Sequence, residues 1–157
     1  MASDAPLDAY DKKILRLLQA QGRITNQQLA EEIGLSSAAC WRRVKALEES
    51  GTLRRFTALV DPARVGQPLT ALVMVTLVRH HIDNTAEFER RILEYPEVLQ
   101  CFATTGNADF VLRVVIEDMT AYDRFLNEKL FTLAGISQVN SNFALREIKN
   151  ETAIPIR

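Results

Sequence analysis

Residues 25–51 read TNQQLAEEIGLSSAACWRRVKALEESG, and this stretch decides the fold of the first part of the chain. Thr25 begins a capping-box pattern, Ser36 can cap the next helix, and Gly51 favours the end of that helix. Gly34 lies between the two helices, where a sharp turn is needed. Apolar residues recur at helical spacing on both sides of the turn: Leu29, Ile33, Leu35, Cys40, Val44 and Leu47. Two helices joined in this way outline a helix-turn-helix, whose second helix enters the major groove of DNA.

Positive charge is concentrated in this part of the chain, although the net formal charge of the whole is only −1. Residues 1–65 hold ten lysines and arginines against eight acidic residues, whereas residues 66–157 hold nine against twelve. From Trp41 to Arg55 there are five basic and two acidic side chains. Such clustering is the footprint of phosphate contacts with double-stranded DNA, although a solvated basic helix face has the same composition.

The second helix of the motif presents small residues and then cations opposite its apolar stripe. Small side chains at its start allow a close approach to base edges, and Arg42 is the best candidate for a bidentate base contact or a phosphate clamp. The other cations are expected on phosphates, while Trp41 either touches DNA or packs on the first helix. The residues predicted to contact DNA are Ser36, Ser37, Ala38, Trp41, Arg42, Arg43, Lys45, Arg54 and Arg55.

Regular structure is predicted on both sides of the motif. Asp8 can cap a first helix that ends at Gly22, and Thr52 to Val60 has the pattern of a strand. Proline and glycine then break regular structure over residues 61–69. We therefore expect a winged helix-turn-helix domain over residues 1–60, a linker over 61–69 and a second domain over 70–157.

The second domain has the pattern of a ferredoxin-like unit. Strands are predicted at Thr70–Val78, Glu97–Thr105, Asp109–Glu117 and Ser137–Ile148, and helices at Thr85–Tyr95 and Thr120–Leu133. Phe88, Ile92 and Leu93 lie on one face of the first of these helices. The order β-α-β-β-α-β is the ferredoxin-like arrangement, so the fold class is α+β.

The strands of this domain predict a homodimer. An antiparallel sheet with helices on one face should alternate apolar with polar residues, yet residues 71–75 read ALVMV, and residues 110–116 have only Arg113 as a polar side chain. A large exposed apolar face is unusual in a soluble monomer, so we expect a second subunit to cover it. Two recognition helices in a dimer can read a two-fold symmetric operator.

Several other classes of protein are disfavoured. Cys40 and Cys101 lie far apart without metal-ligand spacing, so neither a disulfide framework nor a metal site is indicated; Cys40 is interpreted as a core residue, with a redox role left open. His80 and His81 are adjacent in a predicted strand and so point to opposite faces. No membrane span or export signal is visible, which favours the cytoplasm. No catalytic or cofactor motif is present, and the acidic, mostly aliphatic second domain argues against an RNA-binding sheet.

The chain resembles the Lrp/AsnC, or feast/famine, family of transcription regulators over nearly its whole length. The resemblance rests on short motifs in both halves: Gly22-Arg23-Ile24-Thr25, Gly34-Leu35-Ser36, Pro96-Glu97-Val98, Thr105 to Phe110 and Ser141 to Leu145. It implies an amino-terminal DNA-binding domain, a carboxy-terminal domain that dimerises through its sheets, further assembly that often reaches octamers, association with the nucleoid, and a small effector, usually an amino acid, bound between subunits.

The same resemblance implies an effector site at the loop from Gly106 to Asp109. Asp109 can pair with the ammonium of an amino acid, and free backbone N–H groups near Gly106 can hold its carboxylate. The simpler interpretation is a hairpin turn capped by Asp109, and an effector-independent nucleoid organiser also stays open. Asn107 and Phe110 replace the acidic residue and tyrosine frequent in the family, so the identity of the effector is left open. The predicted effector-binding residues are Thr104, Thr105, Gly106, Asn107, Ala108, Asp109, Ser141 and Asn142.

Overall fold

The computed structural model describes residues 6–78 and 82–157, so the His80–His81 pair lies outside the described residues. Contacts divide the chain into two compact units. Unit 1 comprises the chain up to Leu59 together with Lys149–Arg157, and unit 2 comprises Val60–Ile148. Lys149–Arg157, the last nine residues of the chain, therefore belong to the same compact unit as the three amino-terminal helices.

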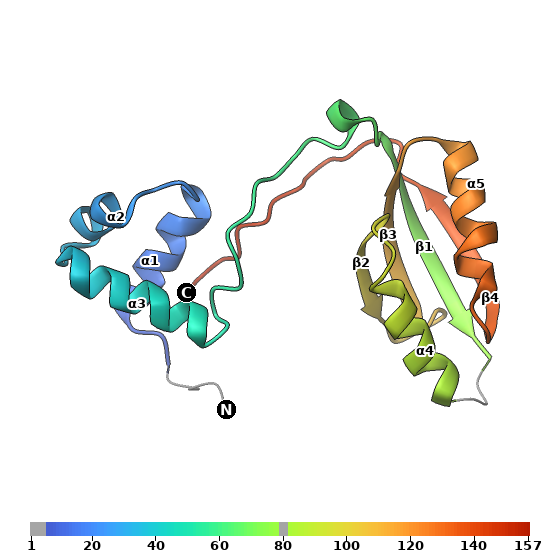
Figure 1. Cartoon of the computed structure of the whole chain (residues 1–157), viewed down its shortest axis with the longest axis horizontal. Coiled ribbons are helices and arrows are strands. Elements are labelled where there is room, and N and C mark those ends of the chain that lie inside the picture. The colour runs from blue at the N-terminus through green and yellow to red at the C-terminus, as the bar shows by residue number, and fades with distance from the viewer. Residues whose placement is uncertain (1–5, 79–81) are drawn as a thin grey trace. The chain divides into compact units, whose positions relative to one another are not determined.

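Three helices build unit 1: α1 (Ala9–Ala20), α2 (Asn26–Ile33) and α3 (Ser37–Glu49) (Figure 1). Each predicted N-cap is confirmed, because the side chains of Asp8, Thr25 and Ser36 accept hydrogen bonds from backbone N–H groups in the first turns. Gly34 ends α2 with a φ of 75°, a left-handed conformation that glycine adopts readily. The three helices share one apolar core: Ile14, Leu15, Leu18, Leu29, Ala30, Ile33, Cys40 and Leu47.

The segment Thr52 to Val60, predicted as a strand, is not a strand in the structure. Residues 54–60 run as exposed chain outside any sheet. A strand needs a neighbouring strand for its backbone hydrogen bonds, and the described part of unit 1 has only helices as regular structure. The apolar, β-branched pattern indicated an extended backbone correctly, but it carried no information about a pairing partner.

Unit 2 contains a four-stranded antiparallel sheet in the order β2-β3-β1-β4 with two α-helices, which confirms the predicted ferredoxin-like fold. Short 3₁₀ turns lie at Ala63–Val65 and Leu130–Thr132. The strands and helices, in chain order, are β1 (Leu69–Leu77), α4 (Ile82–Ile92), β2 (Val98–Ala103), β3 (Phe110–Ile116), α5 (Met119–Glu128) and β4 (Ile136–Phe143).

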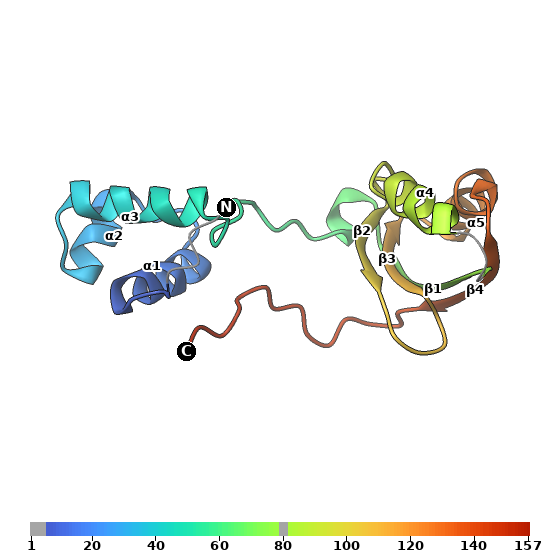
Figure 2. The same ribbon diagram turned by 90° about the horizontal axis from the view of Figure 1, so that it is seen from below.

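Both helices of unit 2 lie on one face of the sheet, and the core fills the space between them and the strands (Figure 2). Val73 and Leu112 from the central strands are fully buried there, together with Phe88 of α4 and Phe125 of α5. Leu93 was predicted on the buried side of its helix, but it is 87% exposed. The prediction was wrong because a rotation of about 100° per residue places Leu93 about 140° from Phe88 and about 100° from Ile92, away from the buried side.

The other face of the sheet is open in the single chain. One row across it joins Phe102, Val111 and Met74 to Asn140 of β4 by their register, and the neighbouring row contains Leu72. Leu72 and Phe102 are 45% and 55% exposed. The row through Met74 is therefore apolar over β1, β2 and β3, whereas the row through Leu72 also contains Arg113 of β3 and Gln100 of β2, and β4 borders both rows with asparagines.

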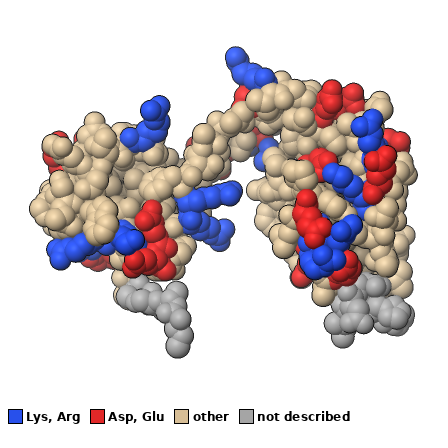
Figure 3. Space-filling model, viewed as in Figure 1, with Lys and Arg blue, Asp and Glu red and all other residues tan. Residues whose placement is uncertain are grey.

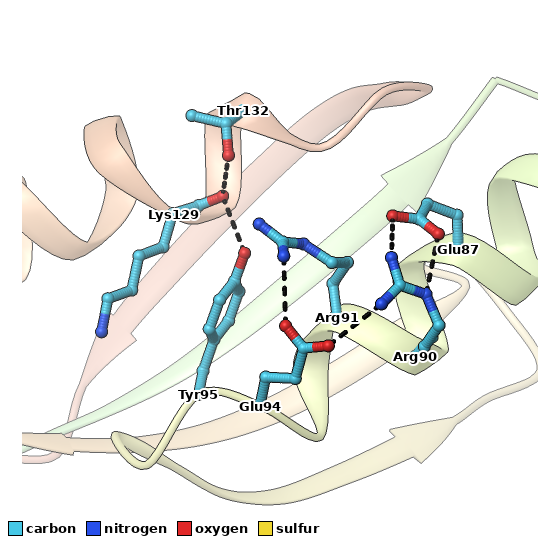
Figure 4. A network of polar contacts seen from close by, with 7 residues as sticks. All are labelled: Glu87, Arg90, Arg91, Glu94, Tyr95, Lys129 and Thr132. Atoms are coloured by element: carbon cyan, nitrogen blue, oxygen red, sulfur yellow. Dashed lines mark hydrogen bonds and ion pairs between the residues drawn. The ribbon is translucent and has the colours of Figure 1, made fainter.

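A polar network covers the ends of the two helices of unit 2 (Figure 4). Along α4, Arg90 pairs with Glu87 at 2.6 Å and with Glu94 at 3.0 Å. Tyr95 donates its hydroxyl to the carbonyl of Lys129, just beyond α5, at 3.4 Å. Because Tyr95 lies three residues beyond α4 and Lys129 one residue beyond α5, this hydrogen bond joins the segments that follow the two helices.

Candidate DNA-binding surface and effector loop

The two sides of α3 differ in the way that a recognition helix requires. Cys40 and Leu47 are buried against α1 and α2, with 0% and 4% exposure. Burial raises the pKa of the Cys40 thiol, so this cysteine stays protonated and packs as a small apolar residue. The opposite side of α3 is open to solvent, with these predicted contact residues exposed: Ser37, Ala38, Trp41, Arg42 and Lys45.

The basic side chains of α3 differ in the contacts that they make with neighbouring side chains. Arg42 is exposed and makes no hydrogen bond or ion pair within the described part of the chain. Lys45 lies 3.7 Å from Glu49 and 5.8 Å from the centre of the Trp41 ring, which is itself 56% exposed. Arg54 and Arg55 follow on exposed chain. Figure 3 shows basic side chains over α3 and beyond its carboxyl end, with acidic side chains among them.

Arg43 occupies a different position from its neighbours. Its Nη1 lies 2.7 Å from Oδ2 of Asp8 and 2.8 Å from Oδ1 of Asp11, both at the start of α1. These hydrogen bonds raise the pKa of Arg43, and the Asp11 backbone and Arg43 together lower that of Asp8. Arg43 therefore fixes α3 to α1, and a phosphate contact by this side chain would compete with two carboxylates.

A contact that sequence reasoning missed fixes the start of α3. Asn26, the first residue of α2, donates from Nδ2 to the carbonyl of Ser37 at 2.9 Å. The Ser36 hydroxyl accepts from the N–H of Ala39 at 3.3 Å, so the first turn of α3 is held from both sides of the motif turn. Helix N-termini attract phosphates, and these contacts orient this one. The asparagine could have been singled out only by knowing that the two helix starts are adjacent.

The loop between β2 and β3 is held to β1 by hydrogen bonds from several of the predicted effector residues. Asp109 Oδ2 accepts from the N–H of Leu77 at 2.7 Å, and the N–H of Asp109 donates to Val75. Thr104 donates its hydroxyl to the carbonyl of Ala108 at 2.7 Å. Gly106 has a φ of 125°, which other residues rarely adopt. The Asp109 carboxylate thus fixes the loop, with one oxygen engaged by the backbone.

Ser141 and Asn142 lie away from this loop within one chain. By register they oppose Val73 and Leu72, whereas the loop is attached at Val75 and Leu77. Four residues of β1 separate Leu77 from Val73, which is about 13 Å along a strand. Ser141 instead shares a 2.5 Å hydrogen bond with the hydroxyl of Tyr122, so within one chain these two β4 residues are not part of the loop.

Unit 2 also has a cavity of about 680 Å³ at the other end of β3. Its apolar floor includes Ile116 and Phe125, and Arg124 and Lys129 line it together with Glu97. Lys129 Nζ lies 2.5 Å from one Glu97 oxygen, while the other Glu97 oxygen is buried without a partner. Sequence reasoning missed this cavity because its walls come from four separated segments.

Among residues 6–78 and 82–157, no group of three or more histidine, cysteine or acidic side chains is placed to hold a metal ion. None of the helices in that described part is long and apolar enough to cross a membrane.

An exposed, cation-bearing recognition helix in a separate unit, joined to a ferredoxin-like unit with a loop and a cavity, defines a DNA-binding regulator with its own sensing domain. The family models agree with this division. The model described as winged helix-turn-helix DNA-binding matches residues 7–54, and the Lrp/AsnC ligand binding domain matches residues 70–154. The chain belongs to the Lrp/AsnC family of transcriptional regulators, as the sequence analysis expected.

Individual relatives span nearly the whole chain. The Bkd operon transcriptional regulator of Pseudomonas aeruginosa is 39% identical over 97% of this chain and 99% of its own length. A transcriptional regulator of Neisseria meningitidis, solved in complex with L-Met, is 39% identical with a TM-score of 0.88, covering 96% of this chain and 97% of that one. An AsnC family regulator from Agrobacterium tumefaciens is 38% identical with a TM-score of 0.88, over 95% and 97% of the two chains.

Proposed function

We propose that this regulator binds a two-fold symmetric operator as a homodimer, within an assembly that reaches an octamer, and that an amino acid bound to unit 2 changes its DNA affinity. Its place of action is the cytoplasm, on the nucleoid, and it catalyses no reaction. The observation that carries the proposal is the exposed side of α3, where Ser37 and Ala38 precede Arg42, which has no ion pair or hydrogen bond among the described residues. Small side chains allow the helix to approach base edges, and the arginine can then donate two hydrogen bonds to guanine.

Dimerisation through the open sheet face supports this proposal. Leu72, Met74, Val111 and Phe102 form a continuous apolar area on that face, and their burial would release water from it. The polar border along β4 can then lie at the rim of the interface, where polar residues are usual. A dimer also places two copies of α3 on one duplex, which a two-fold operator requires.

The effector proposal rests on the loop at Asp109 and on the relative solved with L-Met. Asp109 keeps one carboxylate oxygen beyond the one that accepts from Leu77, and an ammonium can pair with it. Thr105 and the backbone around Gly106 are exposed for a carboxylate. In the dimer assembly, Ser141 and Asn142 of a neighbouring subunit would complete the site.

An effector-independent nucleoid organiser is the second candidate, and the hydrogen bond from Leu77 to Asp109 favours it, because it gives that carboxylate a structural role. A thermal-shift screen of the twenty amino acids separates the two. The proposal expects at least one amino acid to raise the melting temperature and to change operator affinity in a gel shift. Shifts that Asp109→Asn abolishes and Arg124→Ala leaves intact assign the effector to the loop; the reverse assigns it to the cavity. No response to any amino acid would favour the organiser.

A further inference from the structure

The carboxy-terminal segment returns to the DNA-binding unit and docks on α1. Gln19 of α1 contacts the backbone of Ile154 twice: its Nε2 donates to the carbonyl at 3.0 Å, and its Oε1 accepts from the N–H at 2.6 Å. Arg16, one turn earlier, donates from Nη2 to the carbonyl of Ile156 at 2.9 Å and from Nε at 3.3 Å. The C-terminus accordingly lies beside α1 in both ribbon views (Figures 1 and 2). We call residues 149–157 the tail.

The side chains of the tail complete this docking. Ile156 is partly buried and packs against the apolar core of unit 1, whereas Ile154, two residues earlier, is 71% exposed. Glu151 accepts from the N–H of Ala153 at 2.9 Å, which shapes the approach to the docked residues. Arg16 and Gln19 are three residues apart and so share a face of α1. One face of α1 thus binds the tail backbone at two residues, and the Ile156 side chain packs against the apolar core.

We infer that the tail is a second, releasable tether between the sensing unit and the DNA-binding unit, and that its docking controls the operator geometry that the dimer accepts. The chain leaves unit 1 after Leu59, and it returns at Lys149, a few residues beyond the end of β4. A unit held by one linker reorients freely, whereas anchoring a second connection removes much of that freedom. The inference rests on the proposed DNA binding and adds a means of regulating it.

The anchored helix passes the restraint on to the recognition helix. The same α1 that binds the tail holds Asp8 and Asp11 against Arg43 of α3. Anchoring α1 therefore anchors α3, and α3 is the element that must meet the major groove. The docking contacts are few, and the hydrogen bonds lie at the surface, so an event in unit 2 that pulls on β4 can release them.

The test uses a matched pair in the full-length protein: Ile156→Asp removes the apolar anchor, and Ile154→Asp makes the same change at an exposed side chain. Hydrogen exchange at the Ile154 amide reports docking directly. We expect exchange to be at least tenfold faster in Ile156→Asp and unchanged in Ile154→Asp. A second variant that ends at Glu151 removes the docked residues without placing a charge near the core, and circular dichroism confirms that unit 1 stays folded.

Operator binding is then compared on duplexes selected in vitro from random sequence. We expect Ile156→Asp and the truncated chain to bind about tenfold more weakly, and to lose discrimination against operators whose half-sites are moved apart by five base pairs. A wild-type Ile154 amide that exchanges without protection overturns the inference, as does a released tail with unaltered affinity and spacing preference. If the wild-type protein selects no operator, the proposed function fails, while exchange at Ile154 still reports whether the tail docks.

Discussion

Replacing Arg42 by alanine tests the recognition helix at its most exposed cation. Arg42 makes no hydrogen bond or ion pair within the described residues, so the substitution should leave the melting temperature unchanged. A bidentate arginine–guanine contact contributes about 1–3 kcal/mol of base discrimination. Because a dimer loses the contact in both half-sites, the loss is about 2–6 kcal/mol, and the lower bound corresponds to about 30-fold weaker binding.

Fluorescence anisotropy with a labelled operator, at one fixed salt concentration, measures this loss. Arg23→Ala is the matched control, because Arg23 is an exposed cation between α1 and α2 and is not among the predicted DNA contacts. A base contact predicts that Arg42→Ala also relaxes preference at one position in each half-site. A phosphate contact predicts instead that affinity falls equally for all DNA sequences, and that the slope of log affinity against log salt concentration is smaller by about 1 per contact. Unchanged affinity together with unchanged base preference would refute the assignment of Arg42 to the DNA surface.

The remaining predictions concern stability and the effector. Thr25→Ala removes the N-cap of α2 and should cost about 1 kcal/mol, which lowers the melting temperature of unit 1 by about 4–8 °C in calorimetry. Leu112 is 0% exposed, so Leu112→Ala should destabilise unit 2 by about 2–5 kcal/mol in urea titration, and a smaller loss would contradict the described core. Because the pKa of folded Asp8 lies below its ordinary 3.8, its stabilisation is fully present above pH 3.8 and is lost as the pH falls through the folded value; Asp8→Asn should flatten that part of the urea midpoint profile. Asp109→Asn keeps an acceptor for Leu77 but removes the charge, so it should abolish an amino-acid response in the gel shift while DNA binding persists.

The features that the sequence predicted correctly are local ones. The caps at Asp8, Thr25 and Ser36 each join residues three apart, and the β-α-β-β-α-β order follows from periodicity within single segments. The buried stripe of α3 likewise follows from 100° of rotation per residue, which Cys40 and Leu47 bear out.

The features that could not be predicted from the sequence depend on contacts between residues that are far apart in the chain. Arg43 and Arg42 are adjacent arginines that the sequence alone does not distinguish. The carboxylate partners of Arg43 lie 32 and 35 residues away in the chain. The tail contacts α1 across 135 and 140 residues, and nothing in its own pattern indicates that partner. The expected strand at Thr52 to Val60 failed for the same reason, since pairing depends on a second segment.

Methylation interference on the selected operator tests the central claim most directly, because a methyl group on guanine N7 blocks the major groove alone. Two copies of α3 predict two clusters of interfering guanines, related by two-fold symmetry and separated by about 10 base pairs or a multiple of it. Interference in one cluster only, or none while the protein remains bound, would contradict recognition of DNA by a dimer through this helix.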